Sequence, residues 1–222
     1  GDVYKRQIYI NAGQHDAHLH LTAGVLNRPG NLDTWHAATV KARLDGNEAA
    51  LRLSQSDIKG RTGYDLGIAA TADAADSSFT FHIRPVDPII AYQNWTANDD
   101  NFISYTVPTQ HIDANLRMSG AGSSLAIFTE HPEGHDSHAD DSQEDLVIRL
   151  SDIHISDWIS MNPFAPPMKG DVTADMRLNR HDGRIVGQGT AGISNFVYGR
   201  EKVADFKADF NVAATPSGTI NA

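Results

Sequence analysis

The stretch GDVTADMRLNR, residues 170–180, alternates apolar and polar side chains over its length. Val172, Ala174, Met176 and Leu178 occupy every second position, and the residues between them are polar or charged. Successive side chains of a β-strand point to opposite faces of the sheet. The pattern therefore predicts a strand with one apolar face and one solvated face.

The same alternation returns along most of the chain. Turn-forming pairs such as Asp45-Gly46 and Asp182-Gly183 separate the repeats. The longest helix that the pattern allows is a short piece near residues 156–161, stopped by Pro163. We therefore expect an all-β fold built as a long antiparallel meander. The clearest alternating segments are 18–22, 38–44, 50–54, 64–70, 78–83, 111–118, 145–150, 170–180 and 204–212.

A long sheet with one apolar face must cover that face. It can fold into a sandwich, close into a barrel or curl into an open trough that a ligand or partner fills. The monotonous series of strands and the many small apolar residues favour an open, taco-like groove with an apolar interior; a closed β-sandwich is the alternative. We expect the following residues to line the groove: Leu19, Leu21, Val40, Leu44, Leu51, Leu53, Leu66, Ile68, Phe79, Phe81, Ile83, Ile112, Leu116, Met118, Ile148, Val172, Ala174, Met176, Leu178, Phe206 and Phe210.

Length and charge limit the classes of function. The chain has 222 residues, no cysteine and a net charge of −10. A negative surface disfavours nucleic acid as a partner, and no apolar run is long enough to span a bilayer. The first residues, GDVYKRQ (1–7), resemble a translated sequencing-adapter tail. We treat residues 8–222 as one elongated segment of a longer protein.

Residues 187–192, GQGTAG, have the glycine spacing of a dinucleotide-binding loop. Such a loop binds phosphate because it opens a helix. Here β-branched and aromatic residues follow Gly192, and Gly187 and Gly189 fall on the apolar face of an alternating segment. We therefore predict a strand, and no nucleotide cofactor.

Two stretches interrupt the alternation, residues 84–101 and 162–170, and both contain prolines. Because proline cannot donate to a sheet ladder, these are expected to be connections or edges. Trp35, Trp95 and Trp158 are far apart in sequence, and each is expected to be a local packing anchor.

A loop at residues 130–145 is acidic and rich in histidine. The spacing of His131, His135 and His138 would suit a metal ion, but the loop contains no rigid pair of ligands on a helix. The expected state is a solvated acidic loop without a metal. No Gly-x-Ser-x-Gly elbow occurs and no carboxylate pair stands out, so we expect no enzyme.

Three stretches resemble the TamB family, within the AsmA-like group. ISDWISMNPFAPPMKGDVTADMRL (155–178) resembles a strand that runs into a proline-containing connection and then into an alternating strand. IRPVDPIIAYQNWTANDDNFISY (83–105) resembles a connection in TamB-like proteins of Bacteroidetes-type bacteria, and GTAGISNFVYGREKVADFKADFNV (189–212) fits the end of the pattern. The residues that carry the resemblance are Pro85, Pro88, Ile90, Ala91, Tyr92, Trp95, Asn98, Asn101, Pro163, Phe164, Pro166, Pro167, Gly170, Val172, Ala174, Asp175 and Met176.

The resemblance implies a periplasmic segment of a protein that is anchored in the inner membrane outside this stretch. TamB-like proteins form a long apolar β-groove, are implicated in phospholipid movement between the membranes, and support outer-membrane protein assembly with a BamA-like barrel partner. Acyl chains would lie against the apolar positions and slide along a uniform lining. We expect Met176→Asp or Leu116→Asp to block transport with little loss of fold. The alternative function is a scaffold or chaperone that binds protein partners by edge-strand pairing.

Overall fold

The computed structural model describes residues 7–15, 18–26, 35–57, 59–130, 145–159, 166–181, 184–214 and 220–221. These residues form an almost entirely β structure, which confirms the predicted fold class. The sequence-based expectations for residues 1–6, for 131–144, for Asp182-Gly183 and for Pro163 and Phe164 fall outside the described residues. The elements are β1 (Gln7–His15), β2 (His18–Leu26), β3 (Trp35–Asp45), β4 (Glu48–Asp57), β5 (Thr62–Asp73), β6 (Ser78–Ile83), β7 (Ile89–Ile90), β8 (Gln93–Ala97), β9 (Phe102–Thr106), β10 (His111–Gly120), β11 (Ser123–Glu130), β12 (Asp145–His154), α1 (Ile155–Ile159), β13 (Met168–His181), β14 (Arg184–Tyr198), β15 (Glu201–Lys202), β16 (Phe206–Ala214) and β17 (Ile220–Asn221).

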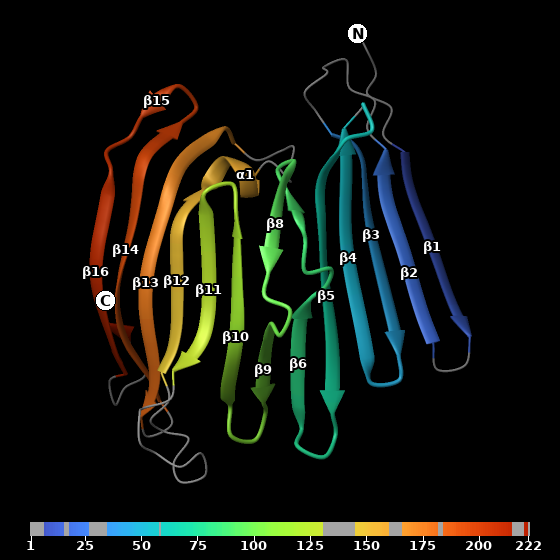
Figure 1. Cartoon of the computed structure of the whole chain (residues 1–222), viewed down its shortest axis with the longest axis horizontal. Helices are drawn as coiled ribbons and strands as arrows, with labels where there is room; N and C mark the ends of the chain where they lie inside the picture. Colours follow the sequence, from blue (N-terminus) through green and yellow to red (C-terminus); the bar gives the residue numbers. More distant parts are fainter. Residues whose placement is uncertain are drawn as a thin grey trace.

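The strands form an antiparallel meander (Figure 1). From β1 to β5 and from β10 to β14, each strand pairs with the next one in the sequence. The middle of the sheet is divided. β5 pairs with β6 along one half and with β7 along the other, and β10 closes the gap by pairing with both β9 and β8.

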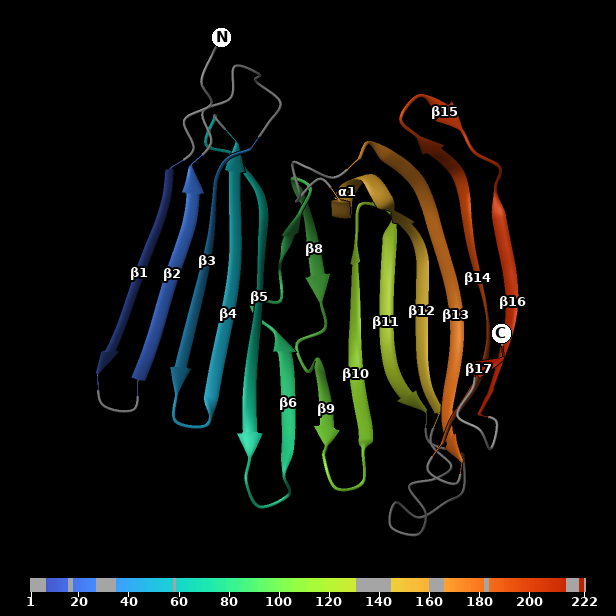
Figure 2. The same cartoon turned by 180° about the vertical axis from the view of Figure 1, so that it is seen from behind.

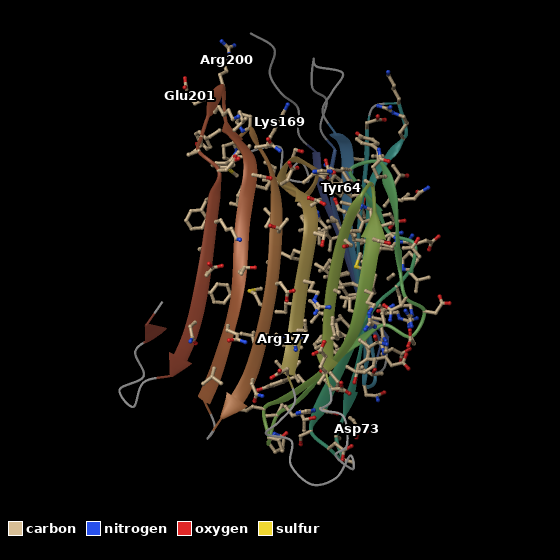
Figure 3. The ribbon with its side chains drawn as sticks, turned by 60° about the vertical axis from the view of Figure 1, so that its left-hand side comes forward. Tyr64, Asp73, Lys169, Arg177, Arg200 and Glu201 are labelled. Carbon is tan, nitrogen blue, oxygen red and sulfur yellow. The ribbon has the colours of Figure 1, made fainter. Side chains whose placement is uncertain are left out.

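The sheet is open and bent. Figures 1 and 2 show β1 and β16 at opposite sides, and no pairing joins these two strands in the described ranges. In Figure 3 the N-terminal strands lie behind the middle strands, so the sheet curves across its width. The described strands belong to one connected system, without a second sheet packed on it. They do not form the closed sandwich that the sequence left as an alternative.

The strand register places the apolar positions on one face. Directly paired residues of an antiparallel ladder share a face of the sheet. Leu51 pairs with Ile68, which pairs with Ile83. Farther along, Leu116 pairs with Ile127, Ile127 with Ile148, Ile148 with Met176, Met176 with Gly189 and Gly189 with Phe210. All the predicted lining positions fall on this surface, which we call the apolar face.

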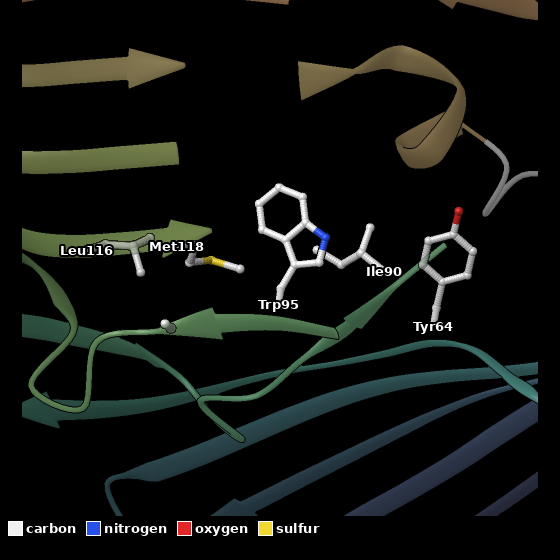
Figure 4. Packing of buried hydrophobic residues seen from close by; sticks show 6 residues of the cluster. Tyr64, Ile90, Trp95, Leu116 and Met118 are labelled. Atoms are coloured by element: carbon white, nitrogen blue, oxygen red, sulfur yellow. The ribbon is translucent and has the colours of Figure 1, made fainter. Parts of the chain in front are cut away.

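The best-buried part of the apolar face lies beneath α1 (Figure 4). Tyr64, Ile90, Trp95, Leu116 and Met118 are buried there, together with Ala97. Trp158 of α1 meets Trp95 edge-to-face, with ring centroids 5.7 Å apart, and the Tyr64 hydroxyl donates to the carbonyl oxygen of Asp157. We call α1 and this cluster the α1 cap.

Residues 84–101 differ from the expectation of a simple connection. They contain β7 and β8, which extend the sheet, and their Pro88, Ile90, Trp95 and Asn101 are fully or almost fully buried. The Asn101 side chain accepts the Ile83 N–H at 2.7 Å and donates to the Asn98 carbonyl at 2.7 Å. These bonds satisfy backbone groups at the end of β6 and in the turn before β9. Trp95 and Trp158 are packing anchors, as predicted, and they belong to the same cluster because they contact each other.

The glycine motif at residues 187–192 lies inside β14, as predicted. Gly189 pairs with Met176 on one side and with Phe210 on the other. A Cβ at Gly189 would lie 2.5 Å from the Asp175 carbonyl oxygen and 3.0 Å from the Phe210 ring. The glycine therefore provides space for close strand packing. Within the described ranges, no helix is long and apolar enough to cross a membrane.

Candidate functional site

The apolar face is widely exposed on the N-terminal half of the sheet. Leu51 at the centre of this region keeps 47% of its surface accessible. Single exposed apolar residues are common on protein surfaces, but a contiguous set is typical of an interaction site. The exposed members are Leu19, Leu21, Val40, Leu44, Leu51, Ile68, Phe79, Phe81 and Ile112.

A hollow of about 470 Å³ occupies this region. Its volume lies in the range of small-molecule binding sites, roughly 300–1,000 Å³. The lining comes from five consecutive strands, β2 to β6, and the alanines on these strands create the depression between the larger side chains. The lining residues are Leu19, Leu21, Ala42, Arg43, Leu44, Ala49, Ala50, Leu51, Ile68, Ala70 and Phe81.

The apolar face is buried near the α1 cap and exposed at the far end of the same strands. Along β5, Tyr64 is 2% exposed and Ile68 is 43% exposed. Along β10, Met118 is 7% exposed at the cap end and Ile112 is 39% exposed at the other end. The apolar face is therefore closed at one end of the middle strands and open at the other end.

The apolar face continues on the C-terminal half of the sheet. Ile148, Met176 and Leu178 are half-buried, and Phe206 is strongly exposed. A Cβ at Gly187 would lie 2.6 Å from the Leu178 side chain, which already occupies the space above that glycine. Gly187 and Gly189 of β14 thus let large neighbours lie flat across the face.

The opposite face of the sheet is polar and carries ion pairs. Arg52 donates to Asp65 at 2.7 Å through its Nε. Arg177 bonds to Glu130 and lies 3.8 Å from Asp145. Partnered charges of this kind are readily solvated. The two faces therefore differ in chemistry, and outside the α1 cap the apolar one is left without a covering layer in the described residues.

A polar cluster on the same opposite face involves His154, Asp171 and Asn195. The Asp171 carboxylate lies 2.7 Å from His154 Nδ1 and accepts from Asn195 Nδ2 at 2.9 Å. The hydrogen bonds from Asn195 and His154 hold the pKa of Asp171 below its usual value. No group of three or more metal-ligating side chains occurs within the described ranges, and His131, His135 and His138 lie outside them.

The predicted lining residues share one face, but they are not equally accessible. Leu116 and Met118 are buried in the α1 cap, and Leu66 and Ile83 pack against it. The expectation of a uniform lining is therefore wrong. Because Leu116 is only 6% exposed, an aspartate there would be buried without a partner, and we expect Leu116→Asp to disturb the fold rather than spare it.

Several members of the apolar face were missed in the sequence. Ile103 of β9 and Leu125 and Ile127 of β11 lie on it and pack against the α1 cap. In residues 123–130 the signal was present, since Leu125 and Ile127 alternate with small residues. Ala42 lies at an apolar position of the alternating segment 38–44, whereas Ala49 and Ala70 carry a weak signal because alanine is common on either face of a sheet.

No protein-family model, curated protein or solved structure matches this chain.

Proposed function

We propose that this chain binds the acyl chains of phospholipid on its apolar face. The observation that carries the proposal is the contiguous set of exposed leucine, isoleucine and phenylalanine side chains around the hollow, such as Leu51, Ile68 and Phe81. Each methylene moved from water onto such a surface contributes about 0.8 kcal/mol. An acyl chain therefore binds without any specific headgroup contact.

The larger role follows from the TamB resemblance and belongs to the same proposal. The segment shields lipid in the periplasm as part of a protein that is anchored in the inner membrane outside this stretch. The full-length protein moves phospholipid between the inner and outer membranes and supports outer-membrane protein assembly with a BamA-like barrel partner. The open sheet supports this role, because an open trough admits lipid from the side.

The test is native mass spectrometry with lipid extraction on the purified chain and on two variants of β5. Ile68→Asp places a charge on the exposed apolar face, whereas Ala69→Asp places the same charge on the opposite face, beside His82. The unchanged chain and Ala69→Asp are expected to retain phospholipid. Ile68→Asp is expected to lose it, because a bound chain would desolvate the carboxylate.

Circular dichroism provides the folding control for both variants. If Ile68→Asp keeps its β spectrum and retains as much lipid as Ala69→Asp, the apolar face is not the lipid site. A folded, unchanged chain that carries no lipid and excludes an added fluorescent fatty acid would contradict the proposal as a whole.

A second candidate function is edge-strand pairing with protein partners. Residues Phe206–Asn211 of β16 pair with β14 on one side, and the described pairing of β17 reaches only Ala213 and Ala214. An open edge of this kind can add a strand from another chain. Ala208→Pro would remove a backbone donor of β16, and partner binding by this edge would then fall while lipid retention stays unchanged.

A further inference from the structure

We infer that the hollow on the apolar face is a binding site for one extended, unbranched acyl chain that lies across the strands. The inference rests on the proposed function and adds to it the place, the number and the length of the bound acyl chains. It follows from the strand register around the hollow and from the chemistry of its lining.

Two rows of directly paired residues line the hollow, and both rows run across the strands from β2 toward β6 (Figure 1). The first row is Leu19, Leu44, Ala49, Ala70 and Phe81. The second row is Leu21, Ala42, Leu51 and Ile68. Because directly paired residues share a face, all these side chains lie on the apolar face. The other two lining residues, Arg43 and Ala50, pair with each other between the rows, so their side chains belong to the opposite face.

The first row changes from large to small side chains and back again. Ala49 and Ala70 are paired neighbours in the middle of this row, with Leu44 on one side and Phe81 on the other. Leu44 and Phe81 are both exposed, so no other part of the described structure covers the space between them. A ligand above the two alanines therefore contacts larger apolar side chains at both ends of the row.

The hollow is longer across the strands than along them. Neighbouring strands lie about 4.8 Å apart, so the lining from β2 to β6 extends over about 19 Å. The two rows are two residues apart along each strand, which corresponds to only about 7 Å. A ligand that matches this shape is long and narrow.

A saturated acyl chain has this shape. An all-trans chain advances about 1.3 Å per carbon, because C–C bonds of about 1.5 Å meet at tetrahedral angles, so about 15 carbons extend along the hollow. The hydrocarbon part of one bilayer leaflet is about 15 Å thick, so the acyl chains of membrane lipids have a similar length. An acyl chain that contacts both rows keeps its carbons about 4 Å from each of them. Rows about 7 Å apart therefore hold one acyl chain and not two.

The lining also determines which part of the lipid the hollow recognises. The side chains of both rows are alanine, leucine, isoleucine and phenylalanine, which contain no hydrogen-bonding group. A polar headgroup placed among them would lose its water without gaining a partner, so the headgroup lies outside the hollow. The hollow therefore selects ligands by the length of the acyl chain and not by the headgroup.

The experiment measures how the affinity depends on the length of the acyl chain. Lysophosphatidylcholines with saturated chains of about 8 to about 18 carbons, each below its micelle concentration, compete with a fluorescent fatty acid for the purified, delipidated protein. Each added methylene is expected to raise the affinity by up to about fourfold. The rise is expected to stop near about 15 carbons, where the acyl chain fills the hollow. Native mass spectrometry is expected to show one lysolipid per protein.

Leucine substitutions on either face locate the effect. Ala70→Leu fills the middle of the first row and is expected to lower the affinity for a lysolipid of about 14 carbons about tenfold, the equivalent of about two lost methylene contacts. Ala49→Leu fills the neighbouring position and is expected to act in the same way, although both variants add apolar surface. Ala69→Leu places the same side chain on the opposite face, beside His82, and is expected to leave the affinity unchanged. Circular dichroism provides the folding control.

The outcomes separate the inference from the proposed function. The inference alone would be overturned by an affinity that rises up to the longest acyl chain, by several lysolipids bound with equal affinity, or by unchanged affinity in the folded Ala70→Leu and Ala49→Leu variants. Each of these results would place the acyl chain elsewhere on the apolar face. No binding of any lysolipid by the folded protein, or a lipid-free dimer that covers the apolar face, would overturn the proposed function together with the inference.

Discussion

Asp171 shows how single side chains connect neighbouring strands on the polar face. It lies on β13, and its carboxylate accepts hydrogen bonds from His154 of β12 and Asn195 of β14. Asn195 adopts a left-handed backbone conformation with φ of 54°, and its backbone N–H donates to Asp205 at 2.8 Å. The cluster thus ties three strands and the following turn together near the α1 end of the sheet.

Asp171→Asn is expected to lower the free energy of unfolding at neutral pH. It should also make the free energy of unfolding depend less on pH in the acidic range. Because the folded pKa of Asp171 lies below the usual 3.8, the unfolded chain binds the proton more readily. The carboxylate therefore stabilises the fold above the unfolded pKa, and this contribution is lost as the pH falls through the folded pKa. We expect a loss of about 0.5–1 kcal/mol at pH 7, measured by urea unfolding.

The difference in stability between the two proteins should shrink from pH 5 toward pH 3. Asp209→Asn on β16, an exposed position of the same face, serves as the control for loss of charge. A difference that stays constant over this range would show that the Asp171 carboxylate is not the group responsible.

Residue by residue, the sequence predicts which face a side chain occupies but not how deeply it is buried. Leu51 and Leu116 lie in similar alternating segments, and their side chains share the apolar face. Leu51 is 47% exposed and Leu116 is 6% exposed. The difference arises because Leu116 packs in the buried cluster that contains Trp95 of β8, and a local sequence pattern does not reveal such a contact.

At the scale of elements, α1 is stabilised by its contacts with the sheet. A helix of five residues is too short to be stable alone. It is held by the ring contact between Trp158 and Trp95 and by the hydrogen bond from Tyr64 to Asp157. On the sheet side, Gly120 allows this arrangement, because a Cβ there would lie 2.5 Å from the Trp95 ring.

Trp158→Ala is expected to release α1 from the sheet and to destabilise the chain by about 1–3 kcal/mol. Near-ultraviolet circular dichroism and urea unfolding measure the lost ring contact and the lost stability. Trp158→Phe keeps a ring in place and should lose less than half as much. Equal stability of Trp158→Ala and the unchanged protein would mean that α1 does not contribute to the core.

The elements that sequence reasoning missed lack the signals on which it depends. In β9, FISYT, the strand is only five residues long and the large apolar Phe102 shares a face with Ser104 and Thr106, so the alternation is weak. The turn between β7 and β8 places Ala91 and Tyr92 at φ of 51° and 66°, where asparagine and glycine are the usual residues. Without those residues the hairpin could not be recognised, and the segment was expected to be a connection.

For the molecule as a whole, protection of backbone amides from hydrogen exchange is expected to be highest in the middle of the sheet. β5 and β10 are paired on both sides and carry buried residues of the α1 cap, whereas β1 and β16 lie at the open edges. Hydrogen exchange measured by mass spectrometry should be slowest in peptides from β5 and β10 and fastest in those from β1 and β16. Equal protection of an edge strand and the middle would indicate that a partner or second copy covers that edge.

The meander also has a consequence for how the chain is made. Since strands β1 to β4 pair only with sequence neighbours, each hairpin closes a short loop and can form as soon as its second strand is available. The junction at β10 is different, because it joins β8 and β9 to the rest of the sheet and completes the cluster with Tyr64. During synthesis from the N-terminus, the hairpins can therefore form one after another. The middle of the sheet and its buried cluster can begin to assemble cooperatively once the polypeptide has been extended to about residue 120.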